Sequence, residues 1–149
     1  MGFRYFEDFT QGEVIELGSR TVSGEEMLEF ARQFDPQPFH LDAEAAKKSL
    51  LGGLCASGWH TGSIFMRFFA EGLLNHCSSQ GSPGMDKLNW PTPLWPGDTV
   101  SARTTIVATR LSKSRPTMGI VSFLHEMTRQ NGDLVLRIEN SAFMGRRPA

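Results

Sequence analysis

Two side chains able to move protons, Asp35 and His40, lie five residues apart in the segment DPQPFH at residues 35–40. The prolines of this segment fix the backbone φ angle at about −65°, so the loop carrying the pair is stiff. General acid–base catalysis needs such groups within about 2.6–3.2 Å of their proton partners, directly or through one water molecule. Asp35 could accept a proton from a water molecule that His40 orients, or to which His40 returns a proton in the reverse direction. The alternative interpretation is structural, with Asp35 at a helix end and His40 packed beside apolar neighbours. Residue types alone leave both open.

A second candidate feature is the segment GGLCASG at residues 52–58, which leads directly into a long apolar stretch. Backbone N–H groups at the start of a helix have no partner within the helix, and the helix dipole adds partial positive charge there. Gly58 has no Cβ to obstruct an approaching carbonyl, so its N–H is a candidate donor to an oxyanion. An N-cap role for Ser57 and a packing role for Gly58 are compatible with this chemistry.

Local patterns predict the helices that position these segments. Ser23 and Glu26 form the pattern of a capping box, in which the Ser23 hydroxyl accepts the Glu26 N–H and the Glu26 carboxylate reaches back. The helix that starts there should end near Phe34, because the residue before a proline is pushed out of the helical region. A second short helix, capped by Asp42, is expected over residues 43–48.

Residues 58–76 predict the dominant helix, because apolar side chains cover most of its circumference. Its polar side chains fall at i, i+4 spacing on one narrow stripe, which leaves the rest of the surface to be wrapped by other structure. Apolar, β-branched or alternating patterns predict the wrapping strands at residues 14–22, 85–90, 98–111, 119–129 and 133–144.

The last two strands should form a hairpin, since the dipeptide Asn131-Gly132 between them favours a type I′ turn. One strand, a helical segment, a long apolar helix and four more strands suit an antiparallel sheet wrapped around a central helix. The expected fold class is therefore α+β, as one hot-dog domain over residues 1–149.

Composition narrows the possible partners and location. The chain carries 15 basic and 16 acidic residues, so no global field draws it to nucleic acid or an anionic membrane. Cys55 and Cys77 lack CxxC spacing and are expected to be reduced core thiols in a cytoplasmic protein. Residues 1–9 lack the apolar run of a secretory signal. The apolar stretch 58–74 contains charged side chains that cost about 2.5–3.5 kcal/mol each at mid-bilayer, so a buried helix is expected rather than a membrane span.

Three motifs together resemble the MaoC-like dehydratases, which include the (R)-specific enoyl-CoA hydratases. They are Asp35-x4-His40, the glycine-rich loop ending in ASG at residues 56–58, and the segment PLWPGD at residues 93–98. The resemblance covers nearly the whole chain. It implies that Asp35 and His40 hold the water that adds across an α,β-unsaturated thioester, and that the Gly58 N–H binds the thioester carbonyl.

The chain departs from this family's common pattern near the predicted acyl pocket. Many relatives have His in place of Ser57 and bulky aliphatic residues in place of Trp59 and His60, so the shape of the pocket is an open question. Candidate substrate-binding residues here are Ser57, Trp59, His60 and Ser63. For His60 the alternative is a core histidine, and for Trp59 a packing residue.

Coenzyme A would bring several phosphates, which need Arg or Lys side chains and backbone donors. Arg110, Lys113 and Arg115 cluster around a predicted strand connection and are candidates, with solvated loop charges as the alternative interpretation. The histidines lack metal-ligand spacing and no HExxH motif is present, so neither a metal nor a cofactor is expected.

The expected reaction is reversible syn addition of water to a trans-2-enoyl acyl-CoA thioester by a hydro-lyase. Asp35 would act as general base toward water, His40 as its partner and Gly58 as the oxyanion donor. A hot-dog thioesterase that releases free CoA is one alternative, and a non-catalytic acyl-thioester binding protein is another. A homodimer is expected, because a lone five-stranded sheet around one helix leaves edge strands and a wide cleft.

Overall fold

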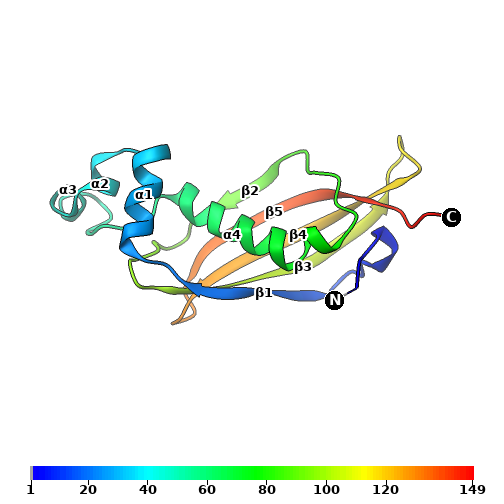
Figure 1. Ribbon diagram of the computed structural model, residues 1–149, viewed down its shortest axis with the longest axis horizontal. Coiled ribbons are helices and arrows are strands. Elements are labelled where there is room, and N and C mark those ends of the chain that lie inside the picture. Colours follow the sequence, from blue (N-terminus) through cyan, green and yellow to red (C-terminus); the bar gives the residue numbers. More distant parts are fainter. Residues whose placement is uncertain (1) are drawn as a thin grey trace.

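A five-stranded antiparallel sheet curves around one long helix in the computed structural model, which describes residues 2–149 (Figure 1). The strand order β1-β3-β4-β5-β2 leaves β1 and β2 at the two edges. The predicted α+β hot-dog arrangement is confirmed. The elements are η1 (Phe6–Asp8), β1 (Val14–Thr21), α1 (Gly24–Phe34), α2 (Pro38–Leu41), α3 (Ala43–Lys47), α4 (Gly58–Gly72), η2 (Leu74–His76), β2 (Met85–Asn89), β3 (Thr99–Leu111), β4 (Met118–Arg129) and β5 (Leu134–Gly145).

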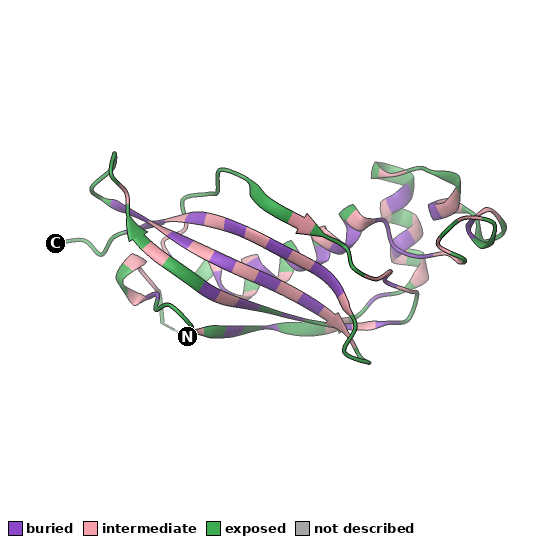
Figure 2. Ribbon diagram, turned by 180° about the vertical axis from the view of Figure 1, so that it is seen from behind, coloured by how far each residue is buried: buried purple, intermediate pink, exposed green. Residues whose placement is uncertain are grey.

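The core lies between α4 and the concave face of the sheet. Buried and partly buried residues alternate along β4 and β5, as expected for strands with one buried face (Figure 2). Phe65 and Phe69 of α4 project toward this face, where the Phe69 ring lies 5.3 Å from that of Phe123 in β4. The sheet therefore covers the face of α4 that carries Ile64, Phe65 and Phe69. The predicted wrapping of most of the helix is wrong in part, because Trp59 and Met66 are exposed.

The helix α1 begins and ends where the sequence predicts, but its cap differs from the expectation. The Ser23 hydroxyl accepts a hydrogen bond from the Glu26 N–H at 3.1 Å. The reciprocal half of the predicted capping box is wrong, because the Glu26 carboxylate pairs instead with the Arg20 guanidinium. A charged partner on the neighbouring strand outcompetes the local backbone donor.

The segment after α1 forms the short helix α2, where its prolines predict a stiff loop. Pro38 occupies the first position of α2, where its missing N–H costs no helical hydrogen bond. The expected short helix follows as α3, with the Asp42 carboxylate accepting from the Glu44 N–H at 2.8 Å. The helices α1, α2 and α3 gather beyond one end of the sheet (Figure 1).

Two further details differ from the sequence-based expectation. The long helix ends at Gly72, and the predicted residues up to His76 continue as the separate turn η2. The β4–β5 connection is not a type I′ turn, since Gly132 has φ +91° whereas Asn131 has no positive φ. The Gly132 N–H instead closes a turn onto the Arg129 carbonyl at 3.0 Å, so the loop is one residue longer than predicted.

Within residues 2–149, no helix is both long enough and apolar enough to cross a membrane.

Candidate active site

Asp35 is the C-cap residue of α1, with φ −149° and ψ 67°, at the point where the chain leaves the helix before Pro36. Both oxygens of its carboxylate are held. Oδ1 accepts a hydrogen bond from Gln37 Nε2 at 2.7 Å, and Oδ2 accepts one from the Ser57 hydroxyl at 2.6 Å. Its side chain is only 15% exposed. The carboxylate is thus fixed in orientation by two donors from different segments of the chain.

His40 lies in α2 and is buried. Its Nδ1 lies 3.1 Å from the Cys55 carbonyl oxygen, which can only accept, so Nδ1 carries the proton in this contact. In the neutral ring, Nε2 then holds the lone pair, and it lies 3.5 Å from Asp35 Oδ2. This spacing is too long for a strong direct hydrogen bond, but it lets both atoms contact one water molecule.

The protonation state of Asp35 follows from competing effects. Burial opposes ionisation, but the hydrogen bonds from Ser57 and Gln37, together with the nearby His40, outweigh it and hold the pKa of Asp35 below its ordinary value of 3.8. The carboxylate is therefore ionised at neutral pH. In that form it can only accept protons, which is the state that a general base requires.

Gly58 begins α4, directly after the N-cap Ser57. The Ser57 hydroxyl donates to Asp35 and accepts from the Trp59 N–H at 3.3 Å, so one residue joins the helix start to the carboxylate. No acceptor for the Gly58 N–H is found among residues 2–149. A Cβ built at Gly58 would lie 2.6 Å from Cε2 of Trp90, so only glycine fits here.

A groove of about 250 Å³ opens beside these groups. His40 and Gly58 lie in its wall together with the polar side chains of Thr61 and Thr92. The rest of the lining is mainly apolar and comprises Phe39, Leu51, Cys55, Ala56, Trp90, Pro93, Leu94 and Val135. We call this groove the catalytic pocket. An apolar wall with a few convergent polar groups is typical of a small-molecule site.

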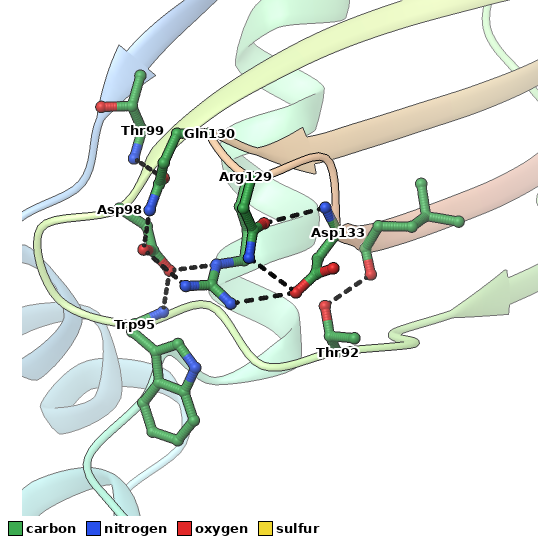
Figure 3. A network of polar contacts seen from close by, with 9 residues as sticks. Thr92, Trp95, Asp98, Thr99, Arg129, Gln130 and Asp133 are labelled. Carbon is green, nitrogen blue, oxygen red and sulfur yellow. Dashed lines mark hydrogen bonds and ion pairs between the residues drawn. The ribbon is translucent and has the colours of Figure 1, made fainter.

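A network of polar contacts centred on Asp98 holds the loop 92–98, which forms one wall of the catalytic pocket (Figure 3). Asp98 Oδ2 accepts from the Trp95 N–H at 2.8 Å, and Oδ1 accepts from Gln130 Nε2 at 2.8 Å. Arg129 Nε lies 3.0 Å from Oδ2. Burial opposes the ionisation of Asp98, but these donors hold its pKa below the ordinary value.

A backbone hydrogen bond ties this loop to the segment before α4. The Leu94 carbonyl accepts a hydrogen bond from the Ala56 N–H at 2.9 Å, two residues before Gly58. The Thr92 hydroxyl donates to the Leu134 carbonyl at 2.8 Å at the start of β5 (Figure 3). Asp98 therefore supports the start of α4 through Leu94, although it does not line the pocket itself.

The structure separates the predicted substrate-binding residues into two groups. Ser57 lies at the site, in contact with Asp35. None of the four lines the pocket, and the other three lie further along α4. Trp59 is 60% exposed, and the Ser63 hydroxyl donates to the Trp59 carbonyl. His60 is buried and stacks on Phe30 of α1 at 4.8 Å, and this burial lowers its pKa.

The predicted phosphate ligands lie far from this site. Thr99, the first residue of β3, pairs with Thr21, just before α1. Arg110 lies eleven residues further along β3, or about 36 Å at the usual rise per residue. Lys113 and Arg115 follow in the β3–β4 connection, at the opposite end of the sheet from α1 to α3 (Figure 1). A single chain does not bring them to Asp35 and His40, and their role as CoA ligands stays a prediction.

Sequence reasoning missed two residues of the site. Gln37, which orients Asp35, lies in the stiff segment next to it, so a carboxamide two residues from a candidate base was an available signal. Thr61 lines the pocket one turn after Gly58, on the same face of α4. Among residues 2–149, no group of three His, Cys, Asp or Glu side chains is placed to hold a metal ion.

Comparison with known proteins relates this chain to one protein family. A family model described as MaoC like domain matches residues 8–125. The chain is 40% identical to a MaoC-like dehydratase from Rhodospirillum rubrum, with a TM-score of 0.90 over 98% of this chain and 99% of that one. It also superposes on an (R)-hydratase from A. caviae with a TM-score of 0.71, at 22% identity over 95% of this chain and 99% of the other, a similarity of fold.

A curated relative, the uncharacterized protein YdeM of Bacillus subtilis, is 34% identical over 93 residues. This match spans 62% of the present chain and 65% of YdeM.

Proposed function

Because the chain belongs to the MaoC-like family, we propose that it is a hydro-lyase that adds water reversibly to a 2-enoyl thioester and forms a 3-hydroxyacyl thioester. One observation supports this most strongly. Asp35 Oδ2 and His40 Nε2 lie 3.5 Å apart beside a pocket whose wall contains the start of α4. The two side chains that would handle water therefore lie close to a donor for the thioester oxygen.

Asp35 and His40 divide the handling of water. A water molecule between them donates one hydrogen to the Asp35 carboxylate and the other to His40 Nε2, which leaves its oxygen lone pairs free to attack. As the oxygen bonds to Cβ of the substrate, Asp35 takes the proton, and the electrons of the C=C bond move toward the thioester carbonyl. Asp35 then returns the proton to Cα on the same face, so the addition is syn. Dehydration follows the same steps in reverse.

Gly58 stabilises the charge that develops on the thioester oxygen. Its N–H lacks a protein acceptor within residues 2–149, and it lies at the positive end of the α4 dipole. A preorganised donor of this kind acts on the enolate more strongly than on the neutral carbonyl, which lowers the barrier. The contact of Trp90 with Gly58 excludes any larger residue at this position.

The substrate in this proposal is an acyl-CoA thioester, and the activity is of the (R)-specific enoyl-CoA hydratase type. The mainly apolar wall of the catalytic pocket suits an acyl group. The (R)-hydratase of A. caviae shares the fold and supports the choice of reaction type. The thiols of Cys55 and Cys77 are unpaired and buried, which suits the cytoplasmic location that we propose.

We also propose that the protein works as a homodimer of one-domain chains. Exposed apolar side chains gather on α4 and on the edge strand β2, namely Trp59 and Met66 on the helix and Met85 on the strand. Trp59 and Met66 lie seven residues apart and so share one face of α4. A free strand edge beside such side chains invites a second copy. A solution mass near 16.6 kDa at micromolar concentration, rather than twice that value, would contradict the dimer.

The test is incubation of a catalytic amount of the purified protein with crotonyl-CoA, while both the enoyl absorbance and the free thiol are followed. We expect the absorbance to fall with no release of thiol. Release of thiol at the same rate would identify a thioesterase instead. Binding of acyl-CoA without either change would identify a non-catalytic binding protein, and both outcomes would refute the proposed reaction.

A further inference from the structure

The burial of its lining divides the catalytic pocket into an inner part and a mouth. The inner lining is buried and comprises His40, Cys55, Ala56, Thr61, Leu94 and Val135. The outer lining is partly exposed, with Phe39 and Leu51 on one side and Trp90 and Thr92 on the other. A thioester whose carbonyl contacts the Gly58 N–H therefore leaves the pocket between these two sides.

The two sides of the mouth differ in the cations that they offer. The segment from β2 to β3 forms one side, and its cation Lys87 lies 3.7 Å from the Glu139 carboxylate. The short helix α3 leads to the other side. It ends at Lys47 and is capped by Lys48, three residues before Leu51 in the pocket wall. Phosphates that emerge from the mouth therefore meet two adjacent ammonium groups on the α3 side.

Both lysine side chains are available to an anionic ligand. Lys47 Nζ lies 3.2 Å from Glu44 Oε1, but the two side chains are 66% and 73% exposed, so this ion pair is weak. Lys48 is exposed and makes no ion pair within residues 2–149. The other carboxylate of this helix, that of Asp42, is occupied at the opposite end, where it accepts from the Glu44 N–H.

A hydrogen-bonded turn keeps the lysines close to the mouth. The Ser49 hydroxyl donates to the Ala46 carbonyl at 2.6 Å and accepts from the Leu51 N–H at 3.2 Å. The Gly52 N–H closes the turn onto the Ser49 carbonyl at 3.1 Å, with Gly52 at φ +73°, a conformation that favours glycine. Three residues of chain span at most about 11 Å, so Lys48 stays near Leu51.

From this arrangement we infer that Lys47 and Lys48 bind the phosphates at the nucleotide end of CoA and so make the protein prefer a CoA thioester to a thioester without phosphates. The inference rests on the proposed function and names a binding site for its substrate. Leu50, which is fully exposed between these lysines and the pocket wall, offers apolar surface to the adenine base. The predicted cations of the β3–β4 connection are the alternative site, at the opposite end of the sheet (Figure 1).

The test compares the hydration of crotonyl-CoA with that of crotonyl-pantetheine, which has the same thioester but no phosphate. In Lys47→Ala/Lys48→Ala, the KM for crotonyl-CoA should rise by about three- to tenfold at low ionic strength, with kcat unchanged. Both constants for crotonyl-pantetheine should stay at the wild-type values. Added salt should raise the KM of the wild type for crotonyl-CoA toward that of the variant, because it screens the exposed charges.

The matched control is Arg67→Ala/Arg103→Ala. These two cations are 69% and 53% exposed, each lies in an ion pair, and neither lines the catalytic pocket. Their removal changes the net charge by the same amount, so it separates a local contact from the general field of the protein. We expect the KM for crotonyl-CoA to stay within about twofold of the wild type in this control.

Three results would overturn the inference. The first is an unchanged KM for crotonyl-CoA in the folded lysine variant, and the second is an equal rise for crotonyl-pantetheine. The third is a selective rise for crotonyl-CoA in Lys113→Ala/Arg115→Ala instead, which would assign the phosphates to the β3–β4 connection. In all three the wild type still hydrates both thioesters, whereas failure of the wild type to hydrate either would overturn the proposed function and the inference with it.

Discussion

Lowering the pH from 7.5 to 4.5 should cost the protein about 2.5 kcal/mol of stability through one residue, His125. This side chain is fully buried among the aromatic rings of the core. Its Nε2 lies 2.7 Å from Asn140 Oδ1, which accepts, and its Nδ1 lies 2.9 Å from the Thr104 hydroxyl. Neither partner carries a charge, so nothing compensates the burial of an imidazolium.

Burial lowers the pKa of His125 from 6.5 to about 4, despite the hydrogen bond to Asn140 that acts in the opposite direction. Above pH 6.5, both the folded and the unfolded chain hold a neutral ring. Between pH 6.5 and 4 the unfolded chain takes up a proton that the folded chain refuses, so stability falls as the pH falls. At about 1.36 kcal/mol per pKa unit, the loss by pH 4.5 is about 2.5 kcal/mol.

The assay is urea unfolding of the wild type and of His125→Gln at pH 7.5, 6.0 and 4.5. Glutamine keeps a donor and an acceptor for Thr104 and Asn140 but does not titrate, so subtraction of the two stability curves removes the contribution of all other groups. The variant starts less stable, and the difference between the two proteins should shrink by about 2.5 kcal/mol toward pH 4.5. Parallel curves across this range would refute the reasoning.

Three further substitutions test the residues that hold the site and the helix α4 in place. Ser57→Ala removes a donor to Asp35, so kcat/KM should fall by about tenfold. The pKa of Asp35 should also rise, which would move the acid limb of the pH–rate profile to higher pH. Asp98→Asn removes the buried carboxylate that pairs with Arg129, which keeps the more exposed Asp133 as a charge partner, and should cost about 1.5–3 kcal/mol in urea unfolding. A loss below about 1 kcal/mol would show that the pair does not hold the loop. Gly62→Ala meets no neighbouring atom within 4 Å and should stabilise α4 by about 0.5–1 kcal/mol, measured as a higher Tm; a lower Tm would contradict the open space found there.

Much of the fold could be predicted because its signals are local. The boundaries of α1 follow from the Ser23 cap and from the proline after Asp35, and both are where the sequence places them. The strand pattern of β5 follows from a period of two, which the structure shows over residues 136–144. The β4–β5 turn could not be predicted from Asn131-Gly132 alone, because the register of the neighbouring strands decides which residues lie at its centre.

The candidate site could be predicted only in part. Asp35, His40 and Gly58 could be proposed from their types and spacing, because the stiff proline segment and the helix start are local features. The direction in which α4 presents each side chain depends on packing. His60 turns toward α1 rather than toward the pocket for this reason, and no pattern in the sequence indicates it. The distance from Arg110 to the site depends on the length of β3, which only the assembled sheet reveals.

The central claim is that Asp35 and His40 act together on one water molecule. Its most direct test is the hydration of crotonyl-CoA by the wild type, Asp35→Asn, His40→Ala and the double variant, each shown to be folded by circular dichroism. We expect each single variant to lose about 10²–10⁴ in kcat/KM, and the double variant to lose little more than the worse of the two, because the residues work as a unit. A folded Asp35→Asn or His40→Ala protein that hydrated crotonyl-CoA at the wild-type rate would contradict the claim.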